Sequence, residues 1–309
     1  MNRKRDKQQN VDPSDAMRVA ASWGRRFGLY DESGDRGEPQ ARTKGKKLRP
    51  VCGDLVTAAP LDGESDWLID AVLPRDNELA RPDMRGRREV LAANVEMLIV
   101  VACVEPLVDW YIVDRYLAAA EQMHCEAAIV WNKSDLSPSS DELDVFASIG
   151  YPIIHTDTKS GIGIDELADI MRGKRSIFVG QSGVGKSSLI NAIASDDVQR
   201  TGNISNASGE GKHTTVAATL LHLGDGIEVI DSPGVRDYAP SLKDITDAAS
   251  GFVEIRETAH DCRFADCLHR AEPDCAVKAA VENGDISERR YQSYLRLVQL
   301  TRQLNQGKH

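Results

Sequence analysis

The sequence lacks an apolar run long enough to cross a membrane. Its longest such run, Met97 to Val104, has eight residues, whereas a spanning helix needs about 20. An export signal is lacking as well, because polar residues follow the basic stretch Arg3–Arg5 where an apolar segment would be needed. We therefore expect neither a membrane protein nor a secreted one, but a cytoplasmic protein.

The sequence also lacks an excess of positive charge. Its net charge of −10, taken alone, argues against a nucleic-acid partner, and no DNA partner is expected. Residues 1–90, however, carry 18 Lys and Arg against 16 Asp and Glu, a balance of +2, so the remaining residues carry −12. Within this part, residues 42–49 hold five basic residues in eight. This basic loop is compatible both with a solvated loop and with a contact to an RNA backbone.

Cysteine is scarce, and a chain without an export signal is not expected to form disulfides. Three of the six cysteines nevertheless lie with one histidine within fourteen residues. Three thiolates and one imidazole complete a tetrahedral zinc shell and leave no position for a catalytic water, so we predict one structural Zn²⁺. The predicted ligands are Cys262, Cys267, His269 and Cys275.

Five segments of different composition predict the domain organisation. Residues 1–15 are polar with almost nothing to bury, which is typical of a disordered tail. Short strand-like runs separated by turns in 16–74 favour an OB-fold barrel, and 75–90 is expected to be a basic linker. Alternating buried strands and amphipathic helices in 91–243 predict a doubly wound α/β domain. Residues 244–309 are expected to form a mainly helical zinc-binding domain.

A glycine-rich stretch in the α/β part matches the phosphate-binding pattern GxxxxGK[ST], between an expected strand at 176–179 and an expected helix from 188. Its backbone N–H groups can point at phosphate oxygens, Lys186 can reach the outer phosphates, and the Ser187 hydroxyl can bind magnesium. An ordinary glycine-rich turn is the alternative. The predicted phosphate loop comprises Gly180, Gln181, Ser182, Gly183, Val184, Gly185, Lys186 and Ser187, with Ser188 beside it.

A second motif predicts the base. Asp135 can accept hydrogen bonds from guanine N1–H and its exocyclic amine, a donor pair that adenine lacks. The motif follows an expected strand at 127–131 and consists of Asn132, Lys133, Ser134 and Asp135. A turn sequence without a ligand is the alternative. Asp157, Thr158 and Lys159 follow the next expected strand and are predicted to close over the guanine through backbone N–H groups.

Two further segments predict the magnesium site and the switch. Asp231 follows an expected strand and can hold a magnesium-bound water, and the Gly234 N–H can meet the γ-phosphate. Thr214 or Thr215, in a segment rich in glycine and serine, can complete the magnesium shell when the γ-phosphate is present. The predicted magnesium ligands are Ser187, Thr214, Thr215 and Asp231.

Catalysis is less clearly encoded. Ras-like enzymes place a glutamine that orients the attacking water directly after the switch glycine, but here the residue is Val235. His213 is the nearest candidate replacement, and a structural or merely exposed histidine is the alternative. We predict Lys186, His213, Thr214 and Thr215 as the catalytic set, with slow turnover that a partner accelerates.

The motifs follow one another in an unusual order. The base motif comes first, then the base-closing loop, the phosphate loop, the switch threonine and the Asp231 segment, which is a circular permutation of the Ras-like order. Permutation is tolerable because domain termini tend to lie close together at the surface. The Asp231–Gly234 segment now leads into the C-terminal residues, so we expect nucleotide state to be transmitted there.

The permuted motifs, together with the Cys/His cluster, resemble the RsgA (YjeQ) family of small-ribosomal-subunit biogenesis GTPases over nearly the whole chain. The resemblance implies an α/β protein with an N-terminal OB-like barrel, a circularly permuted P-loop GTPase domain and a C-terminal zinc domain. It also implies GTP/GDP with Mg²⁺, one Zn²⁺, and a partner, the small ribosomal subunit with its rRNA, that stimulates hydrolysis during late maturation near the decoding region.

Two departures from the family pattern are local. The stretch before the basic loop lacks a Cys- and Arg-rich strand, and Asp157-Thr158-Lys159 replaces a Ser-Ala-Lys type of sequence. We expect a monomeric GTPase; alternatives are an RNA-binding regulator that uses GTP and GDP as a conformational switch with negligible hydrolysis, and an ATP-driven enzyme, which Asp135 disfavours.

Overall fold

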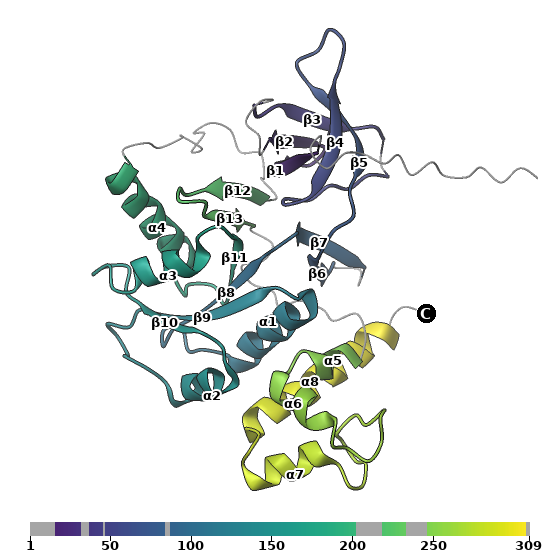
Figure 1. Ribbon diagram of the computed structural model, residues 1–309, viewed down its shortest axis with the longest axis vertical. Helices are drawn as coiled ribbons and strands as arrows, with labels where there is room; N and C mark the ends of the chain where they lie inside the picture. The colour runs from purple at the N-terminus through teal and green to yellow at the C-terminus, as the bar shows by residue number, and fades with distance from the viewer. Residues whose placement is uncertain are drawn as a thin grey trace, which may run out of the picture.

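The computed structural model describes residues 16–31, 37–45, 47–83, 87–201, 218–232 and 246–306. Figure 1 shows a small β-barrel at the top, an α/β unit in the middle and a group of helices at the bottom. The strands of the barrel and of the α/β unit join in one continuous sheet of eleven strands, which fixes the two units relative to each other.

Five strands form the barrel. The pairing order is β1-β2-β3-β5-β4, and β4 returns to β1, so the sheet closes on itself with β3 and β5 parallel. Closure removes the edge strands, and the inward side chains of Met17, Val19, Val56 and Ile69 are fully buried inside. The strands are β1 Met17–Trp23, β2 Arg26–Tyr30, β3 Gln40–Thr43, β4 Leu55–Pro60 and β5 Trp67–Val72.

The stretch expected as a linker contains secondary structure of its own. Strand β6, Glu78–Pro82, pairs with β7, Arg88–Ala93, in a separate two-stranded sheet. Before it, Arg75 bonds Asp54 of the barrel through Nε at 2.6 Å and Glu78 through Nη1 at 2.7 Å. The basic residues that the structure describes in this stretch, Arg75, Arg81, Arg87 and Arg88, therefore pair with local carboxylates, a tertiary effect that charge composition alone could not reveal.

The α/β unit is a twisted sheet with helices on both faces. Four parallel neighbours, β10-β9-β8-β11, are followed by β13, also parallel, and by antiparallel β12, which pairs with β1 of the barrel. The strands are β8 Met97–Ala102, β9 Glu126–Asn132, β10 Ile153–Thr156, β11 Arg175–Val179, β12 Ala218–His222 and β13 Glu228–Asp231. The helices are α1 Trp110–Met123, α2 Asp141–Ile149, α3 Ile164–Met171 and α4 Lys186–Thr201.

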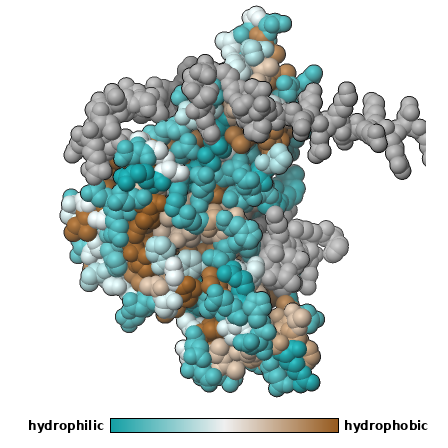
Figure 2. Space-filling model, in the orientation of Figure 1, coloured by the Kyte–Doolittle hydropathy of each residue, from teal (hydrophilic) through white to brown (hydrophobic). Residues whose placement is uncertain are grey.

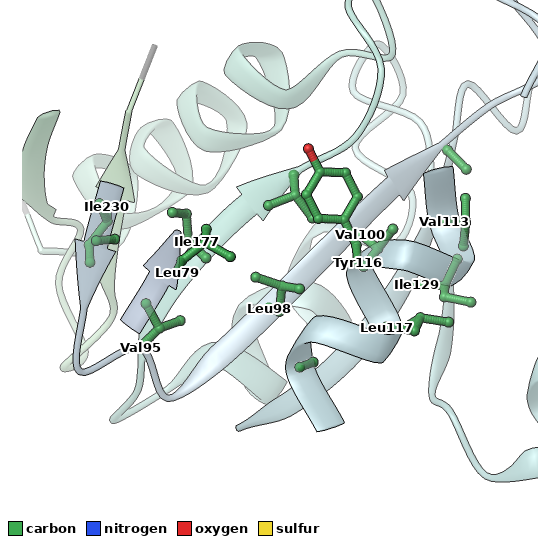
Figure 3. Packing of buried hydrophobic residues seen from close by; sticks show 14 of the residues in the cluster. Leu79, Val95, Leu98, Val100, Val113, Tyr116, Leu117, Ile129, Ile177 and Ile230 are labelled. Atoms are coloured by element: carbon green, nitrogen blue, oxygen red, sulfur yellow. The ribbon is translucent and has the colours of Figure 1, made fainter. Parts of the chain in front are cut away.

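Strand β8 shows why both faces must be covered. All six of its side chains are buried, and successive side chains point to opposite faces of the sheet. Leu98 and Val100 pack toward α1, against side chains such as Leu117, as Figure 3 shows, whereas Ile99 packs with residues of α3 and α4. Truncating Leu98, which is fully buried, to Ala should cost about 2–5 kcal/mol.

The C-terminal unit is helical and packs against α1. It contains α5 Thr246–Ser250, α6 Val253–Ala259, α7 Ala276–Asn283 and α8 Glu288–Gln306. Phe252, Ile255, Tyr294 and Val298 are buried in its core, which also takes in Ala118 of α1. Among the helices that the structure describes, none is both long and apolar enough to span a membrane.

Candidate nucleotide site and metal centre

The predicted phosphate loop lies between β11 and α4. Steric constraints explain why three of its positions are glycine. Gly180, Gly183 and Gly185 have φ values of +134°, +81° and +100°, which disfavour any residue with a side chain. A Cβ at Gly180 would lie 2.2 Å from the Val101 carbonyl oxygen. A Cβ at Gly185 would lie 2.2 Å from Nδ2 of Asn132, so the loop needs glycine where the predicted base motif approaches it.

The base motif and the phosphate loop are bonded directly to each other. Asn132 is 1% exposed, and its Nδ2 donates to the Val184 carbonyl at 2.8 Å. Lys133 Nζ donates to the Gly183 carbonyl at 2.9 Å and to the Glu105 carbonyl at 2.5 Å. Two segments some fifty residues apart in sequence therefore form one surface at the carboxyl edge of the parallel sheet, where ligands of such sheets bind.

Asp135 stands at the exposed rim of this surface. Its Oδ2 accepts a hydrogen bond from Lys159 Nζ at 3.0 Å, and this bond raises the pKa of Lys159. Ser134 is also held, because its N–H donates to the Thr156 carbonyl at 3.1 Å. Lys159 thus links the base-closing loop to the carboxylate that is predicted to read guanine.

The Asp157 carboxylate is bonded within its own loop. It accepts the Ser160 hydroxyl at 2.5 Å and the Lys159 N–H at 3.0 Å, and these bonds, the Ser160 hydroxyl first, lower its pKa. The carboxylate therefore shapes its own loop. Of the three backbone N–H groups predicted to close over guanine, two already have partners in this loop, because Lys159 N–H donates to the Asp157 carboxylate and Asp157 N–H donates to the Ile162 carbonyl at 3.0 Å. Thr158 is half-buried in the same turn.

Lys186 is buried and turned back onto the phosphate loop. Its Nζ donates to the carbonyls of Gly180 and Gln181 at 2.7 Å each. Ser182, Ser187 and Ser188 are exposed around it. Asp231 ends β13, the strand beside β11, so its position matches the same sheet edge. His213, Thr214, Thr215 and Gly234, as well as Val235, lie outside the described residues.

The Cys/His cluster of the C-terminal unit has the spacing of a metal shell. Its four ligand atoms lie within 4.8 Å of one another. Cys262 Sγ and Cys275 Sγ are 3.9 Å apart, and each lies 3.5 Å from His269 Nδ1. In a tetrahedron with metal–sulfur bonds of about 2.3 Å, sulfur atoms lie about 3.8 Å apart, so the residues present fit zinc.

The backbone around the cluster is fixed by its neighbours. His269 has a φ of +54°, and the Tyr291 hydroxyl donates to its carbonyl at 2.6 Å. The Tyr294 hydroxyl donates to the Leu268 carbonyl at 2.9 Å. Burial alone would raise the pKa of Glu272, but backbone N–H groups, among them that of Arg270 at 2.7 Å, bond its carboxylate and lower the pKa to about 2.

A cavity of about 910 Å³ opens where the three units meet, away from the phosphate loop. Lys47 and Arg49 of the basic loop line it from the barrel side, Met123 and His124 from the end of α1, and Arg256 from the C-terminal unit. Leu48 and Leu79 are among its apolar walls. Figure 2 shows that most of the face in view is hydrophilic, with the largest hydrophobic area over the parallel-sheet part.

The profile of the RsgA GTPase family matches residues 72–240. The chain belongs to the RsgA GTPase family. The small ribosomal subunit biogenesis GTPase RsgA of Saccharophagus degradans is 38% identical over 283 residues, 87% of this chain and 82% of that protein. The protein of the same description from Pseudomonas aeruginosa (strain LESB58) is 41% identical over 237 residues, 75% of this chain and 70% of that one.

Two solved structures share the fold. YjeQ from Thermotoga maritima superimposes with a TM-score of 0.72 at 32% identity, covering 93% of this chain and 98% of that one. YloQ, described as a circularly permuted GTPase, has a TM-score of 0.68 at 27% identity, covering 97% and 98%. These similarities confirm the predicted fold, a permuted α/β GTPase with an N-terminal barrel, and the predicted class of enzyme, a GTPase that binds guanine nucleotide.

The structure adds residues that the sequence did not single out. Thr156 holds the base motif, because its hydroxyl donates to Asn132 Oδ1 at 3.0 Å inside the core. The backbone carbonyl of Glu105 accepts a hydrogen bond from Lys133 Nζ. Thr156 carries a weak signal, since it ends the strand next to β9 and precedes Asp157. The role of Glu105 is that of a backbone carbonyl, which any residue could supply, so the sequence holds no signal for it.

Proposed function

We propose that this protein hydrolyses GTP to GDP and phosphate and acts in late maturation of the small ribosomal subunit, which stimulates its turnover. The observation that carries the proposal is the bond from Asn132 to the Val184 carbonyl, because it joins a guanine-type motif to a phosphate loop in one surface. The curated relatives bear the description small ribosomal subunit biogenesis GTPase.

The nucleotide roles follow from the chemistry of the side chains. Asp135 accepts from guanine N1–H and the exocyclic amine, and Lys159 orients that carboxylate. Lys186 leaves the carbonyls it now contacts and binds the outer phosphates, which offer a full negative charge instead of a dipole. The backbone from Gly180 to Ser188 surrounds the phosphates. Mg²⁺ is held by Ser187, Thr214 or Thr215, and Asp231, and the Gly234 N–H meets the γ-phosphate.

For hydrolysis, His213 positions the attacking water, because Val235 has no polar group for that task. The same valine favours a second candidate, an RNA-binding regulator whose bound nucleotide sets its shape with negligible turnover. The two candidates share the nucleotide site and differ only in the rate of the chemical step.

The contact with rRNA uses the basic loop and the cavity between the units. Arg49 and Lys47 are exposed and line that cavity, whereas Arg75 and Arg88 are paired with Glu78. Unpaired surface cations bind phosphodiesters because they release the counterions of the nucleic acid. We further propose that the protein acts as a cytoplasmic monomer.

The division into domains stays as proposed from the sequence, with a barrel at 16–74, a connecting segment at 75–90, a GTPase domain at 91–243 and a zinc domain at 244–309; the tail predicted at 1–15 lies outside the described residues. Closure of the sheet between β1 and β4 supports the barrel. One structural Zn²⁺, held by the Cys/His cluster, stabilises the zinc domain.

The decisive measurement is GTP hydrolysis by the full chain with and without purified small ribosomal subunits. The proposal expects slow turnover alone and a large acceleration by the subunits. Turnover that stays negligible in both conditions, with GDP and GTP still bound, establishes the regulator instead. In a second measurement, unlabelled GDP and unlabelled ADP compete with labelled GDP for the nucleotide site. An ATP-driven enzyme is excluded if ADP fails to displace the labelled GDP.

The role of His213 has its own test. His213→Ala is expected to reduce turnover and to leave GDP affinity nearly intact, because a residue that only orients water contributes little to ground-state binding. Equal turnover in the variant and the parent would remove His213 from the mechanism.

A further inference from the structure

The side chain of Gln181 ties the phosphate loop to the beginning of helix α1. Its Oε1 accepts the Asp109 N–H at 2.9 Å, and its Nε2 donates to the Leu107 carbonyl at 3.3 Å. Leu107 and Asp109 lie between β8 and α1, and the Asp109 carboxylate caps the helix by accepting the Tyr111 N–H at 3.0 Å. One amide therefore holds, with both its polar atoms, the backbone that sets where α1 begins.

Lys186 contacts the same residue from the other side. Its ammonium group donates to the Gln181 carbonyl and to the Gly180 carbonyl. When phosphates occupy the loop, this lysine turns to them and gives up both carbonyls, while the loop N–H groups become ordered around the phosphate oxygens. Phosphate binding thus acts on the residue that holds α1.

Farther along the helix, α1 is joined to the C-terminal unit by a buried ionic contact. Asp114 is 1% exposed and accepts Arg289 Nη1 at 2.5 Å and Arg290 Nη1 at 2.7 Å. Arg290 is also 1% exposed, and its Nη2 donates a hydrogen bond to the carboxylate of Glu254 in α6 at 2.8 Å. Because separating a buried ion pair leaves a charge without compensation, a shift of α1 must move α6 and α8 with it.

A close backbone approach adds to this contact. A Cβ at Gly251 would lie 2.7 Å from Cβ of Ala118, so the C-terminal unit touches α1 without room between them. Glu121, near the end of α1, bonds Arg256 of α6 at 2.9 Å. Residues 114, 118 and 121 are spaced by one helical turn, so they lie on one face of a 14-residue helix whose start is held by Gln181.

We propose that occupancy of the phosphate loop and docking of the C-terminal unit are linked through Gln181 and helix α1. The inference rests on the proposed nucleotide site and names a regulation of it. Its route uses only described residues and does not pass through the 231–234 segment. Nucleotide binding orders Gln181 and tightens docking, and by thermodynamic reciprocity docking raises nucleotide affinity.

The first test is hydrogen exchange of the full chain, with and without GDP and Mg²⁺. In the parent protein, GDP should slow exchange of amides in α6 and α8. Gln181→Leu keeps the size of the side chain but removes both hydrogen bonds, and should reduce this GDP-dependent slowing about fivefold. Gln181→Asn, whose amide is one methylene shorter, is a second variant with the same expected result.

The matched control is Leu107→Ser. The Leu107 side chain is 81% exposed, and its carbonyl, which Gln181 uses, is kept in the variant. The control should retain the full response. An undiminished response in both Gln181 variants would overturn the inference.

The second test changes the docking contact of the C-terminal unit and measures the effect on GDP binding. Arg289→Met removes one partner of Asp114 and leaves Arg290 in place, so it should weaken GDP binding by about fivefold in the parent background and not further in the Gln181→Leu background. If Arg289→Met weakens GDP binding by the same factor in the parent and in the Gln181→Leu background, the inference is overturned. A parent protein that binds no GDP overturns the proposed nucleotide site, whereas GDP binding without any response in α6 and α8 overturns the linkage alone.

Discussion

The two predicted ligand sites of this protein are built in opposite ways. The Cys/His cluster draws all four ligand atoms from residues 262–275, a single short segment. The nucleotide surface draws on segments near 105, 132, 157, 180 and 231, which only the α/β sheet brings together. The first site is local in sequence and closed, and the second is assembled and open.

The difference extends to how the charged groups are compensated without a ligand. At the nucleotide surface, Lys186 contacts loop carbonyls, Lys133 contacts Gly183, and Asp135 pairs with Lys159, so each charge has a protein partner. The sulfur atoms of the zinc cluster have mainly one another and His269. We therefore expect the nucleotide surface to keep its fold without ligand, and the zinc cluster to lose it.

The largest effect should come from removing zinc. Cys275→Ser should reduce the zinc content to near zero and unfold α6 to α8, because structural zinc contributes an apparent free energy of about 10 kcal/mol. Metal analysis and limited proteolysis measure this. Cys125→Ser, at a half-buried cysteine outside the cluster, is the control and should retain zinc. Zinc retained at the parent level in Cys275→Ser would contradict the assignment.

The next effect is steric and belongs to the nucleotide surface. Gly185→Ala places a methyl group 2.2 Å from Asn132 Nδ2 at a φ of +100°. Strain of this kind costs about 1–3 kcal/mol before any clash is counted, so GDP affinity should fall by about 100-fold or more. Gly173→Ala also has positive φ but meets nothing within 4 Å and should leave affinity unchanged. Titration calorimetry compares the GDP affinities of the two variants. Equal affinities would refute the close contact between position 185 and Asn132.

A smaller effect should follow at the base. Asp135→Asn replaces one acceptor by a donor opposite guanine N1–H and should weaken GDP binding by about 10- to 100-fold, the cost of an unpaired polar contact. Binding of xanthosine diphosphate, whose N1–C2 edge differs in this region, should improve relative to GDP. An unchanged ratio of the two affinities would show that Asp135 does not contact the base.

The smallest effect is pH-dependent and local to the zinc unit. The carboxylate of Glu272 has a folded pKa of about 2, below its ordinary value of 4.5, so it stabilises the fold above pH 4.5 and loses this contribution as the pH falls toward 2. Glu272→Gln should therefore destabilise the zinc unit by about 1 kcal/mol at pH 7, allowing for its partial exposure. Urea unfolding of the zinc-loaded protein at pH 7, where the thiolate ligands keep the metal, should show the variant to be less stable than the parent by this amount; equal free energies of unfolding would contradict the prediction.

Sequence patterns located the strands of the α/β part closely. The expected strand at 176–179 is extended only by Arg175, and the expected strand at 127–131 is longer by one residue at each end, at Glu126–Asn132. The bounds of the barrel strands are harder to read from the pattern: the strand-like run Val51–Val56 enters strand β4 only at Leu55, and β4 continues to Pro60. The reason is Gly53, whose φ of +92° and approach to the Ala93 carbonyl make a turn that only tertiary contacts require.

The Cys/His cluster and the glycine-rich phosphate-loop motif can be predicted from the sequence itself, because their chemistry depends on residue type and spacing within one short segment. Tertiary structure decided that Asn132 reaches Val184, that Gln181 holds the start of α1, and that Asp114 lies buried between Arg289 and Arg290. Each of these contacts joins segments at least fifty residues apart through one or two hydrogen bonds. Only the packed sheet and its helices set such distances, and no local pattern in the chain records them.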